Sequence, residues 1–310
     1  MTRVSPPDLQ SFLTDLDMSV HAANDWGTPA NYIPELACIA PDQFAISVAL
    51  PDGQVLSAGC HDQPFSIQSV SKVFTLACVL GRIGDELWDR VGREPSGTSF
   101  DSIVLLEREQ GRPRNPFINA GALVTTDALL DGRMPADALA EVLGFIRTAA
   151  GDTNIHIDGD VATSEKVTGH RNTALAYYLA SHKNLHNPPN STLETYFHQC
   201  AIAMNTDQLA RAGTVLARFQ NAPRLLSSER ARRINALMMT CGHYDGSGDF
   251  AFRVGLPGKS GVGGGILIIA PGKASIAVWS PGLNNYGNSK VGTEAAHRLA
   301  QFTGWSVFAG

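Results

Sequence analysis

Apolar residues recur along the chain in two spacings, which predict helices in some segments and strands in others. In residues 8–22 they lie three or four positions apart, which predicts an amphipathic helix. Residues 44–50 form a β-like apolar run, and residues 54–59 form a second run of the same kind. The turn signal Pro51-Asp52-Gly53 separates them. We therefore expect a β-hairpin after the first helix.

The middle of the chain has a mainly helical pattern. Residues 69–80 predict a helix that ends at Gly81 and Gly84. Residues 85–230 are expected to be helices joined by loops. Alanine- and leucine-rich helical stretches within this part lie at 120–130, 136–149, 172–182, 191–204 and 206–219.

The C-terminal part returns to a β pattern. Residues 264–270 and 274–280 are two apolar runs around Pro271-Gly272-Lys273, which predicts a second hairpin. Residues 290–302 predict a closing helix. Pairing the two hairpins gives one antiparallel sheet covered by the terminal helices.

The expected fold class is therefore α/β, more strictly α+β. An antiparallel sheet is flanked by terminal helices and joined to a mainly helical lobe. We expect residues 1–310 to form a single catalytic domain. Its α/β lobe spans about 1–75 and 230–310, and its helical lobe spans about 76–229. A cleft between two lobes is a common place for a small-molecule site.

Composition narrows the possible partners. The chain has 310 residues, of which 44% are hydrophobic and 17% charged, as in ordinary globular proteins. A net charge of −5 argues against nucleic-acid binding. The chain has no apolar run of about 18 residues, so we expect no membrane span. The N-terminus has no apolar signal-peptide core, and the five cysteines are scattered, so a cytoplasmic location is expected.

Ser69 and Lys72 are the first candidates for chemistry. Serine and lysine three apart occur by chance in many helices, but residues i and i+3 also share a helix face. Serine is a poor nucleophile without an adjacent base or proton relay. The apolar residues that follow Lys72 predict a buried helix, where a lysine requires an explanation. The helix N-terminus would also favour a developing oxyanion.

The pKa of lysine constrains this chemistry. At an unperturbed pKa of ~10.4, only about one lysine in 2,500 is neutral at pH 7. A tyrosine, with a pKa of ~10, has the same difficulty. Burial or a nearby cation lowers the pKa of lysine. We therefore expect Lys72 and a tyrosine to share the proton, with activity that rises toward alkaline pH.

The segment Lys259-Ser260-Gly261 is the second element of the pattern. Ser-x-x-Lys followed much later by Lys-Thr-Gly is typical of serine β-lactamases and penicillin-binding proteins, and here serine replaces the threonine. A P-loop is excluded because Arg253 occupies the position of its first glycine and a β-like run follows. The Val262 N–H is a candidate oxyanion donor, and the alternative is a plain glycine-rich turn.

Four further residues are candidates for the site, and three of them have a second interpretation. Tyr244 lies in a glycine-flanked loop and is either a surface turn or a positioned phenol. Asn119 is either a polar site residue or the cap of the following helix. Glu165 and Asn172 are seven apart and can share one helix face. For Glu165, the alternative is an ordinary solvated charge.

No metal site or cofactor is expected. His182 and His186 are four apart, but no acidic residue or cysteine nearby supplies a third ligand. The cysteines have no C-x-x-C spacing.

Several segments together resemble the serine-dependent glutaminases, an amidase family with the β-lactamase/transpeptidase fold. The resemblance covers nearly the whole chain. The Ser-Asp-Asn element of class A β-lactamases is absent, which separates the two branches. The matching segments are 31–37, 68–72, 115–122, 164–172, 194–197, 241–245 and 255–262.

The resemblance implies hydrolysis of L-glutamine to L-glutamate and ammonia. It implies Ser69 as nucleophile, Lys72 as its activating partner, Tyr244 as proton relay and Tyr32 as a second phenol. It also implies a homo-oligomer, a tetramer or a dimer. The implied substrate contacts are Tyr32, Ser69, Asn119, Glu165, Asn172, Tyr196, Tyr244 and Val262.

Two rival interpretations remain. One is a penicillin-interacting acyl-serine hydrolase, which the missing Ser-Asp-Asn element and the absence of a signal peptide disfavour. The other is a non-catalytic protein that binds an amino acid. Intact Ser69 and Lys72 argue against this second interpretation, because a binding module needs neither.

Overall fold

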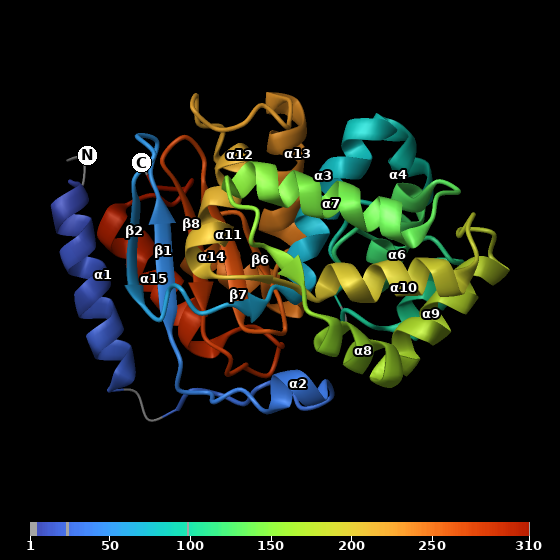
Figure 1. The fold of residues 1–310 in the computed structure, drawn as a ribbon, viewed down its shortest axis with the longest axis horizontal. Helices are drawn as coiled ribbons and strands as arrows, with labels where there is room; N and C mark the ends of the chain where they lie inside the picture. Colours follow the sequence, from blue (N-terminus) through green and yellow to red (C-terminus); the bar gives the residue numbers. More distant parts are fainter. Residues whose placement is uncertain (1–4, 23–24, 98, 310) are drawn as a thin grey trace.

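A computed structural model of the chain describes residues 5–22, 25–97 and 99–309. A five-stranded antiparallel sheet lies at one end of the molecule, and most of the helices lie at the other (Figure 1). The two predicted hairpins are confirmed, and they pair side by side within this sheet. Its strand order is β2 (Val55–Gly59), β1 (Ala45–Ala49), β8 (Ala274–Trp279), β7 (Gly265–Ala270) and β6 (Gly258–Ser260).

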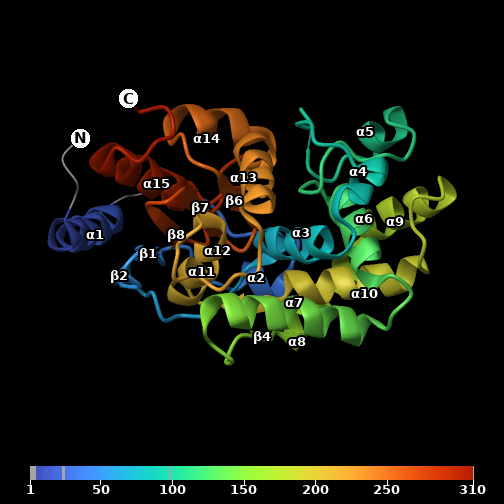
Figure 2. The same cartoon turned by 90° about the horizontal axis from the view of Figure 1, so that it is seen from above.

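The two terminal helices cover one face of the sheet, as predicted. Helix α1 (Pro6–His21) and helix α15 (Lys290–Thr303) lie together on that face (Figure 2). Side chains alternate between the faces of a strand. In β1, Ile46 and Val48 therefore pack with the terminal helices, and Ala45 and Ala49 belong to the core on the other side.

The second face of the sheet joins the helical part. Helix α11 (Thr206–Ala212) contacts β1 and β8, and helix α12 (Thr214–Ala217) contacts β8. The continuous helix expected over 206–219 is therefore wrong, because two short helices meet at Gly213. The helix expected over 191–204 ends earlier, as α10 (Pro189–Cys200), and its last residues form a strand.

That strand belongs to a small sheet that the sequence did not predict. The order is β3 (Phe65–Ser66), β5 (Ile202–Met204) and β4 (His156–Ile157). Strands of two or three residues are too short for a recognisable alternation of apolar and polar positions. The small sheet matters because β3 leads directly into the segment that carries Ser69.

Helix α3 (Ser71–Arg82) follows the 3₁₀ turn η1 (Gln68–Val70). Every side chain from Ser71 to Leu80 is buried, which confirms the predicted buried helix. It passes the predicted stop at Gly81, because that glycine lies on the exposed side with open space around it and a helix tolerates it there.

The remaining elements complete the helical part and the connections. None of the helices in the described residues has the length and apolar character that crossing a bilayer requires. The elements are α2 (Pro34–Ala37), η2 (Gly84–Glu86), α4 (Leu87–Arg90), α5 (Ile103–Arg108), α6 (Asn119–Leu130), α7 (Pro135–Ala150), α8 (Gly159–Thr168), α9 (His170–Ser181), α13 (Ser228–Cys241), η3 (Tyr244–Gly246) and α14 (Ser247–Arg253).

Gly242 allows the end of α13 to lie directly against β6. A Cβ at this position would lie 1.7 Å from the Gly258 carbonyl oxygen and 2.4 Å from that of Met238. Both neighbours are backbone atoms of packed elements. A side chain would therefore force the helix away from the strand.

We expect Gly242→Ala to lower the free energy of unfolding by about 1–3 kcal/mol, the usual cost of overpacking. Gly248→Ala is the matched control, because open space surrounds this glycine within α14. It should raise stability by roughly 0.5–1 kcal/mol, since alanine is the better helix former. Chemical denaturation of both variants measures the two effects. Equal effects of the two substitutions would show that the close contact at Gly242 carries no cost.

Candidate active site

An inner cavity of about 360 Å³ gathers seven of the nine predicted site residues. It lies where the segment after β3 meets the helical part. Of the two others, Lys72 hydrogen-bonds to Asn119 in the cavity wall, and Tyr244 lines a neighbouring cavity. The seven lining residues are Tyr32, Ser69, Asn119, Glu165, Asn172, Tyr196 and Val262.

Ser69 lies in a tightly packed turn. Gln68, the residue before it, has a φ of +49°. This left-handed backbone conformation is uncommon for residues other than glycine. A Cβ on Gly261 would lie 2.6 Å from the Ile67 carbonyl oxygen and 3.3 Å from the Ser69 nitrogen. A Cβ on Gly263 would lie 2.3 Å from the Ser66 carbonyl oxygen. The glycine-rich loop therefore packs against the backbone that carries Ser69.

Lys72 is buried one turn beyond Ser69, with 2% of its surface exposed. Its Nζ donates hydrogen bonds to Asn119 Oδ1 at 2.7 Å and to the Phe117 carbonyl oxygen at 3.2 Å, and neither bond goes to Ser69. It belongs to none of the ion pairs among the described residues. Burial lowers the pKa of Lys72 to about 8. At that pKa about one lysine in ten is neutral at pH 7, compared with about one in 2,500 for a free lysine.

Asn119 links Lys72 to the wall of the cavity. Its side-chain oxygen accepts from Lys72, and its Nδ2 donates to Asn172 Oδ1 at 2.9 Å. The alternative interpretation as a helix cap is wrong, because Ile118 is the N-cap of α6 and no side-chain capping bond forms. Asn119 is instead a polar residue of the cavity wall, at the first position of the helix.

Glu165 and Asn172 do not share one helix face, contrary to the prediction. Helix α8 ends at Thr168 and α9 begins at His170, with Gly169 between them. A Cβ on Gly169 would lie 2.5 Å from the Glu165 carbonyl oxygen, so glycine allows the sharp break. The two residues still meet, because both helices border the inner cavity.

Glu165 is buried rather than solvated. It is 6% exposed, and its Oε1 has no hydrogen-bond partner among the described residues. Burial raises the pKa of Glu165 to about 7, against smaller opposing contributions from Gln68 and Lys72. A buried carboxylate without a cation is costly, and a positively charged ligand would relieve that cost.

Tyr244 is a positioned phenol and not a surface turn. It is buried, and its φ of +55° is another left-handed conformation. Its hydroxyl donates to the Ser260 carbonyl oxygen at 3.2 Å. Burial raises the pKa of Tyr244 well above its ordinary value, and a hydrogen bond with Ser69 opposes that rise. Strained backbone of this kind is concentrated at functional sites.

Lys259 is a second buried lysine that was not assigned to the site from sequence. It is fully buried, and its Nζ donates to the carbonyl oxygens of Gly242, at 3.1 Å, and Ser260. The same Nζ lies 4.5 Å from the centre of the Tyr244 ring. Burial, and then the charge of Lys72, lower the pKa of Lys259. The sequence signal was the Lys259-Ser260-Gly261 element itself, from which only the Val262 N–H was taken as a candidate group of the site.

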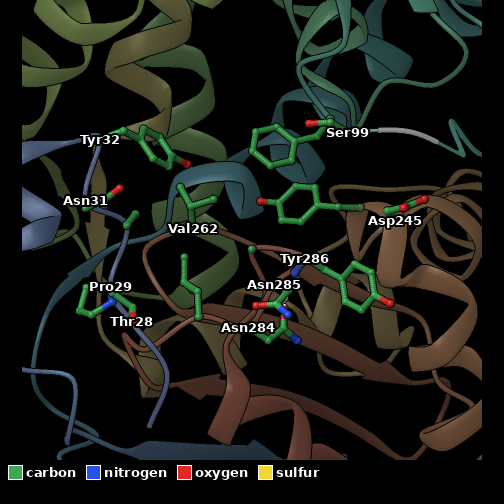
Figure 3. Close-up of a pocket in the computed structure, with 15 residues that line it drawn as sticks. Thr28, Pro29, Asn31, Tyr32, Ser99, Asp245, Val262, Asn284, Asn285 and Tyr286 are labelled. Atoms are coloured by element: carbon green, nitrogen blue, oxygen red, sulfur yellow. Dashed lines mark hydrogen bonds between the residues drawn. The ribbon is translucent and has the colours of Figure 1, made fainter.

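An outer cavity of about 520 Å³ lies beside the inner one. Figure 3 shows Tyr32 and Val262 on one side of this cavity and Asp245 and Tyr286 on the other. Tyr244 also lines it. Tyr32 is 51% exposed and, like Val262, borders both cavities. In the described residues, no three His, Cys, Asp or Glu side chains are grouped closely enough to hold a metal ion.

Comparison with known protein families gives one consistent result. A family model described as Glutaminase matches residues 27–308. A glutaminase from Methylobacterium radiotolerans is 60% identical over 306 residues, covering 97% of this chain and 99% of the relative. A glutaminase from Pseudoalteromonas atlantica is 57% identical over 304 residues with the same coverage.

Comparison with solved structures leads to the same family. A structure described as probable glutaminase ybaS superposes with a TM-score of 0.94 at 36% identity, covering 99% of this chain and all of the other. The probable glutaminase from Bacillus subtilis complexed with 6-diazo-5-oxo-L-norleucine superposes with a TM-score of 0.87 at 32% identity. The match covers 99% of this chain and 98% of the other. The chain therefore belongs to the glutaminase family.

Proposed function

We propose that this glutaminase hydrolyses the side-chain amide of L-glutamine through an ester of Ser69. The observation that carries the proposal is the placing of Ser69 in the wall of the inner cavity, one turn before a buried Lys72 that hydrogen-bonds only to neutral oxygens. A serine that is activated in this way can attack the amide carbon. Ammonia leaves, and water then releases L-glutamate.

The inner cavity suits the amino-acid end of glutamine. Free glutamine carries an α-ammonium group and an α-carboxylate group. Glu165 would pair with the ammonium, which supplies the missing cation for its buried carboxylate. Asn119, Asn172 and the Tyr196 hydroxyl would bind the carboxylate by hydrogen bonds.

The carbonyl oxygen of the amide would accept hydrogen bonds from the backbone N–H groups of Ser69 and Val262. The close packing of Gly261 against the Ser69 nitrogen brings these two backbone segments together. Fixed donors of this kind stabilise a developing oxyanion, and removing one costs about 10²–10³ in kcat in a serine protease.

The shifted pKa values separate the proton donor from the base. Lys72, whose pKa is lowered to about 8, would take the proton of Ser69. Tyr244, whose pKa is raised, stays protonated and would donate to the leaving nitrogen. A water proton then returns to Tyr244 as the hydroxide attacks the ester, and Lys72 returns a proton to Ser69. Tyr32 would close the cavity as the second phenol.

The comparisons support this substrate class. The structure from Bacillus subtilis holds 6-diazo-5-oxo-L-norleucine, whose reactive carbonyl corresponds to the side-chain amide carbon of glutamine. A cavity of the same fold that accepts this compound would accept glutamine. No step of the proposed reaction requires a metal ion or a cofactor.

We also propose the β-lactamase/transpeptidase-like form of the fold, with a single catalytic domain whose two lobes have the boundaries given above. The Ser-x-x-Lys and Lys-Ser-Gly elements, which meet at the site, support this relationship. A homo-oligomer, a tetramer or a dimer, in the cytoplasm stays a prediction from the family resemblance. Sedimentation analysis of the purified protein would measure its oligomeric state.

Ser69→Ala tests the nucleophile. We expect ammonia release from L-glutamine to fall by several orders of magnitude, because no ester can form. The fold should be unchanged, since alanine fits the same turn, and circular dichroism checks this. A folded Ser69→Ala variant that retains most of its turnover would contradict the proposal.

Glu165→Gln tests ammonium recognition. We expect KM for L-glutamine to rise roughly 30-fold or more, because a charge-assisted hydrogen bond to a buried carboxylate is worth about 2–3 kcal/mol. The effect on kcat should be much smaller. Steady-state kinetics separate the two constants. Glu194→Gln, at an exposed position on α10, is the matched control. An unchanged KM in Glu165→Gln would remove the role of this residue.

A further inference from the structure

His243 is a buried histidine that the proposed reaction does not use. It follows the end of α13, directly before Tyr244 and η3, and 1% of its surface is exposed. Neither ring nitrogen has a hydrogen-bond partner among the described residues. Burying a polar group without a partner costs free energy, so a histidine at this position requires an explanation.

The imidazole ring contacts two elements of the fold. Its face stacks on the Phe250 ring of α14, with the ring centres 3.5 Å apart and the planes 13° apart. On β6, a Cβ at Gly258 would lie 2.6 Å from His243 Cε1 and 2.8 Å from the Phe250 ring, so glycine allows the strand to touch both rings. The imidazole therefore packs against α14 on one side and β6 on another.

The backbone of His243 holds the turn that presents Tyr244. Its N–H donates to Ser247 Oγ at 3.0 Å, and its carbonyl oxygen accepts from Asn288 Nδ2 at 3.0 Å. Tyr244 comes next with its φ of +55°, and its hydroxyl donates to the Ser260 carbonyl oxygen of β6. Movement of the His243 ring out of its place would therefore move the phenol.

The carboxylates on the neighbouring elements lie at the surface. Asp245 of η3 and Asp249 of α14 are exposed. Arg253 of α14 pairs with Asp249 and with Glu294. These acidic groups are therefore in water, where they stabilise a charge on a buried ring only weakly.

The other titratable groups around the ring are buried. Burial raises the pKa of the Cys241 thiol and of the Tyr244 phenol, so both are neutral at neutral pH. Lys259 follows Gly258 on β6. Burial, and then the charge of Lys259, lower the pKa of His243, against a smaller opposing contribution from the Gly258 backbone. A proton on this ring would be a buried cation beside a lysine.

We propose that His243 is an acid-sensitive positioning residue for Tyr244. Its uncharged ring holds the Tyr244 turn against α14 and β6, and a proton on the ring releases that turn. The inference rests on the proposed function only for the role of Tyr244 as proton donor.

The direction of the pH effect follows from the two states of the chain. In the unfolded chain, a histidine takes up a proton below about pH 6.5. In the folded chain the lowered pKa keeps the ring neutral to a lower pH, so acid favours the unfolded state, which binds more protons. The stability that depends on the neutral ring is complete above about pH 6.5 and is lost as the pH falls below that value.

Urea denaturation of the full chain at pH 8 and pH 5 tests the acid sensitivity. His243→Met replaces the ring with an adaptable apolar side chain that binds no proton. We expect the unfolding equilibrium constant of wild type to rise about 10- to 30-fold more than that of His243→Met between the two pH values, because the unfolded histidine is protonated at pH 5. The other titrating groups are common to both proteins and cancel in the comparison.

Two further variants complete the test. His156→Met, at an exposed position, is the matched control and should follow wild type at both pH values. His243→Phe, a second uncharged ring, serves the same comparison if His243→Met does not fold. Equal changes in wild type and in the uncharged variant would refute the acid sensitivity.

Hydrogen exchange of backbone amides tests the release of the Tyr244 turn. After correction for intrinsic exchange rates, we expect amides in residues 244–254 to open more readily than the whole protein unfolds. Their opening constant should rise about 10- to 30-fold from pH 8 to pH 5 in wild type and stay nearly constant in His243→Met. If these amides open only when the whole protein unfolds, the positioning role is refuted.

Neither measurement depends on catalysis. A folded enzyme that does not cleave L-glutamine would refute the proposed function, and with it the role of Tyr244 as proton donor. The denaturation and exchange results would still decide whether a proton on His243 releases this turn.

Discussion

The site depends on ionisable side chains that are buried without an ion-pair partner among the described residues. Lys72 makes its hydrogen bonds with neutral oxygens, and Glu165 has a carboxylate oxygen with no partner among the described residues. Burial disfavours the charged form of each, so the pKa of Lys72 falls to about 8 and that of Glu165 rises to about 7. In the proposed reaction each shift would serve a different step. The lowered pKa of Lys72 would supply a base near neutral pH, and the buried Glu165 carboxyl would bind an ammonium group.

Close backbone contacts hold these groups in place. Gly261 allows the glycine-rich loop to touch the turn before Ser69, and Gly242 allows α13 to touch β6. Lys259, on β6, also links this strand to the end of α13, because its Nζ donates to the carbonyl oxygens of Gly242 and Ser260. The Ser260 carbonyl also accepts the hydroxyl of Tyr244. Tyr244, the proposed proton donor, is therefore positioned by contacts between β6 and the end of α13.

The sequence predicted the elements whose pattern is local. Both hairpins, the terminal helices and the buried helix after Ser69 follow from apolar spacing. The sequence motifs contain the residues predicted for the site, seven of which line the inner cavity. Three features could not be predicted in this way. The break at Gly169, which separates Glu165 from Asn172, depends on packing against Phe197 and the Glu165 carbonyl. The burial of Tyr244 and the role of Lys259 depend on contacts between distant segments.

The pH dependence of kcat/KM for L-glutamine tests the central claim most directly, because it reports the buried groups of the free enzyme. With the pKa of Lys72 lowered to about 8, its neutral fraction rises from about one in a hundred at pH 6 to about nine in ten at pH 9. Glu165 ionises over the lower part of the same range. The account predicts that kcat/KM rises through pH 7 and 8 and levels off near pH 9. A value that falls between pH 7 and 9, with the protein folded, would contradict it.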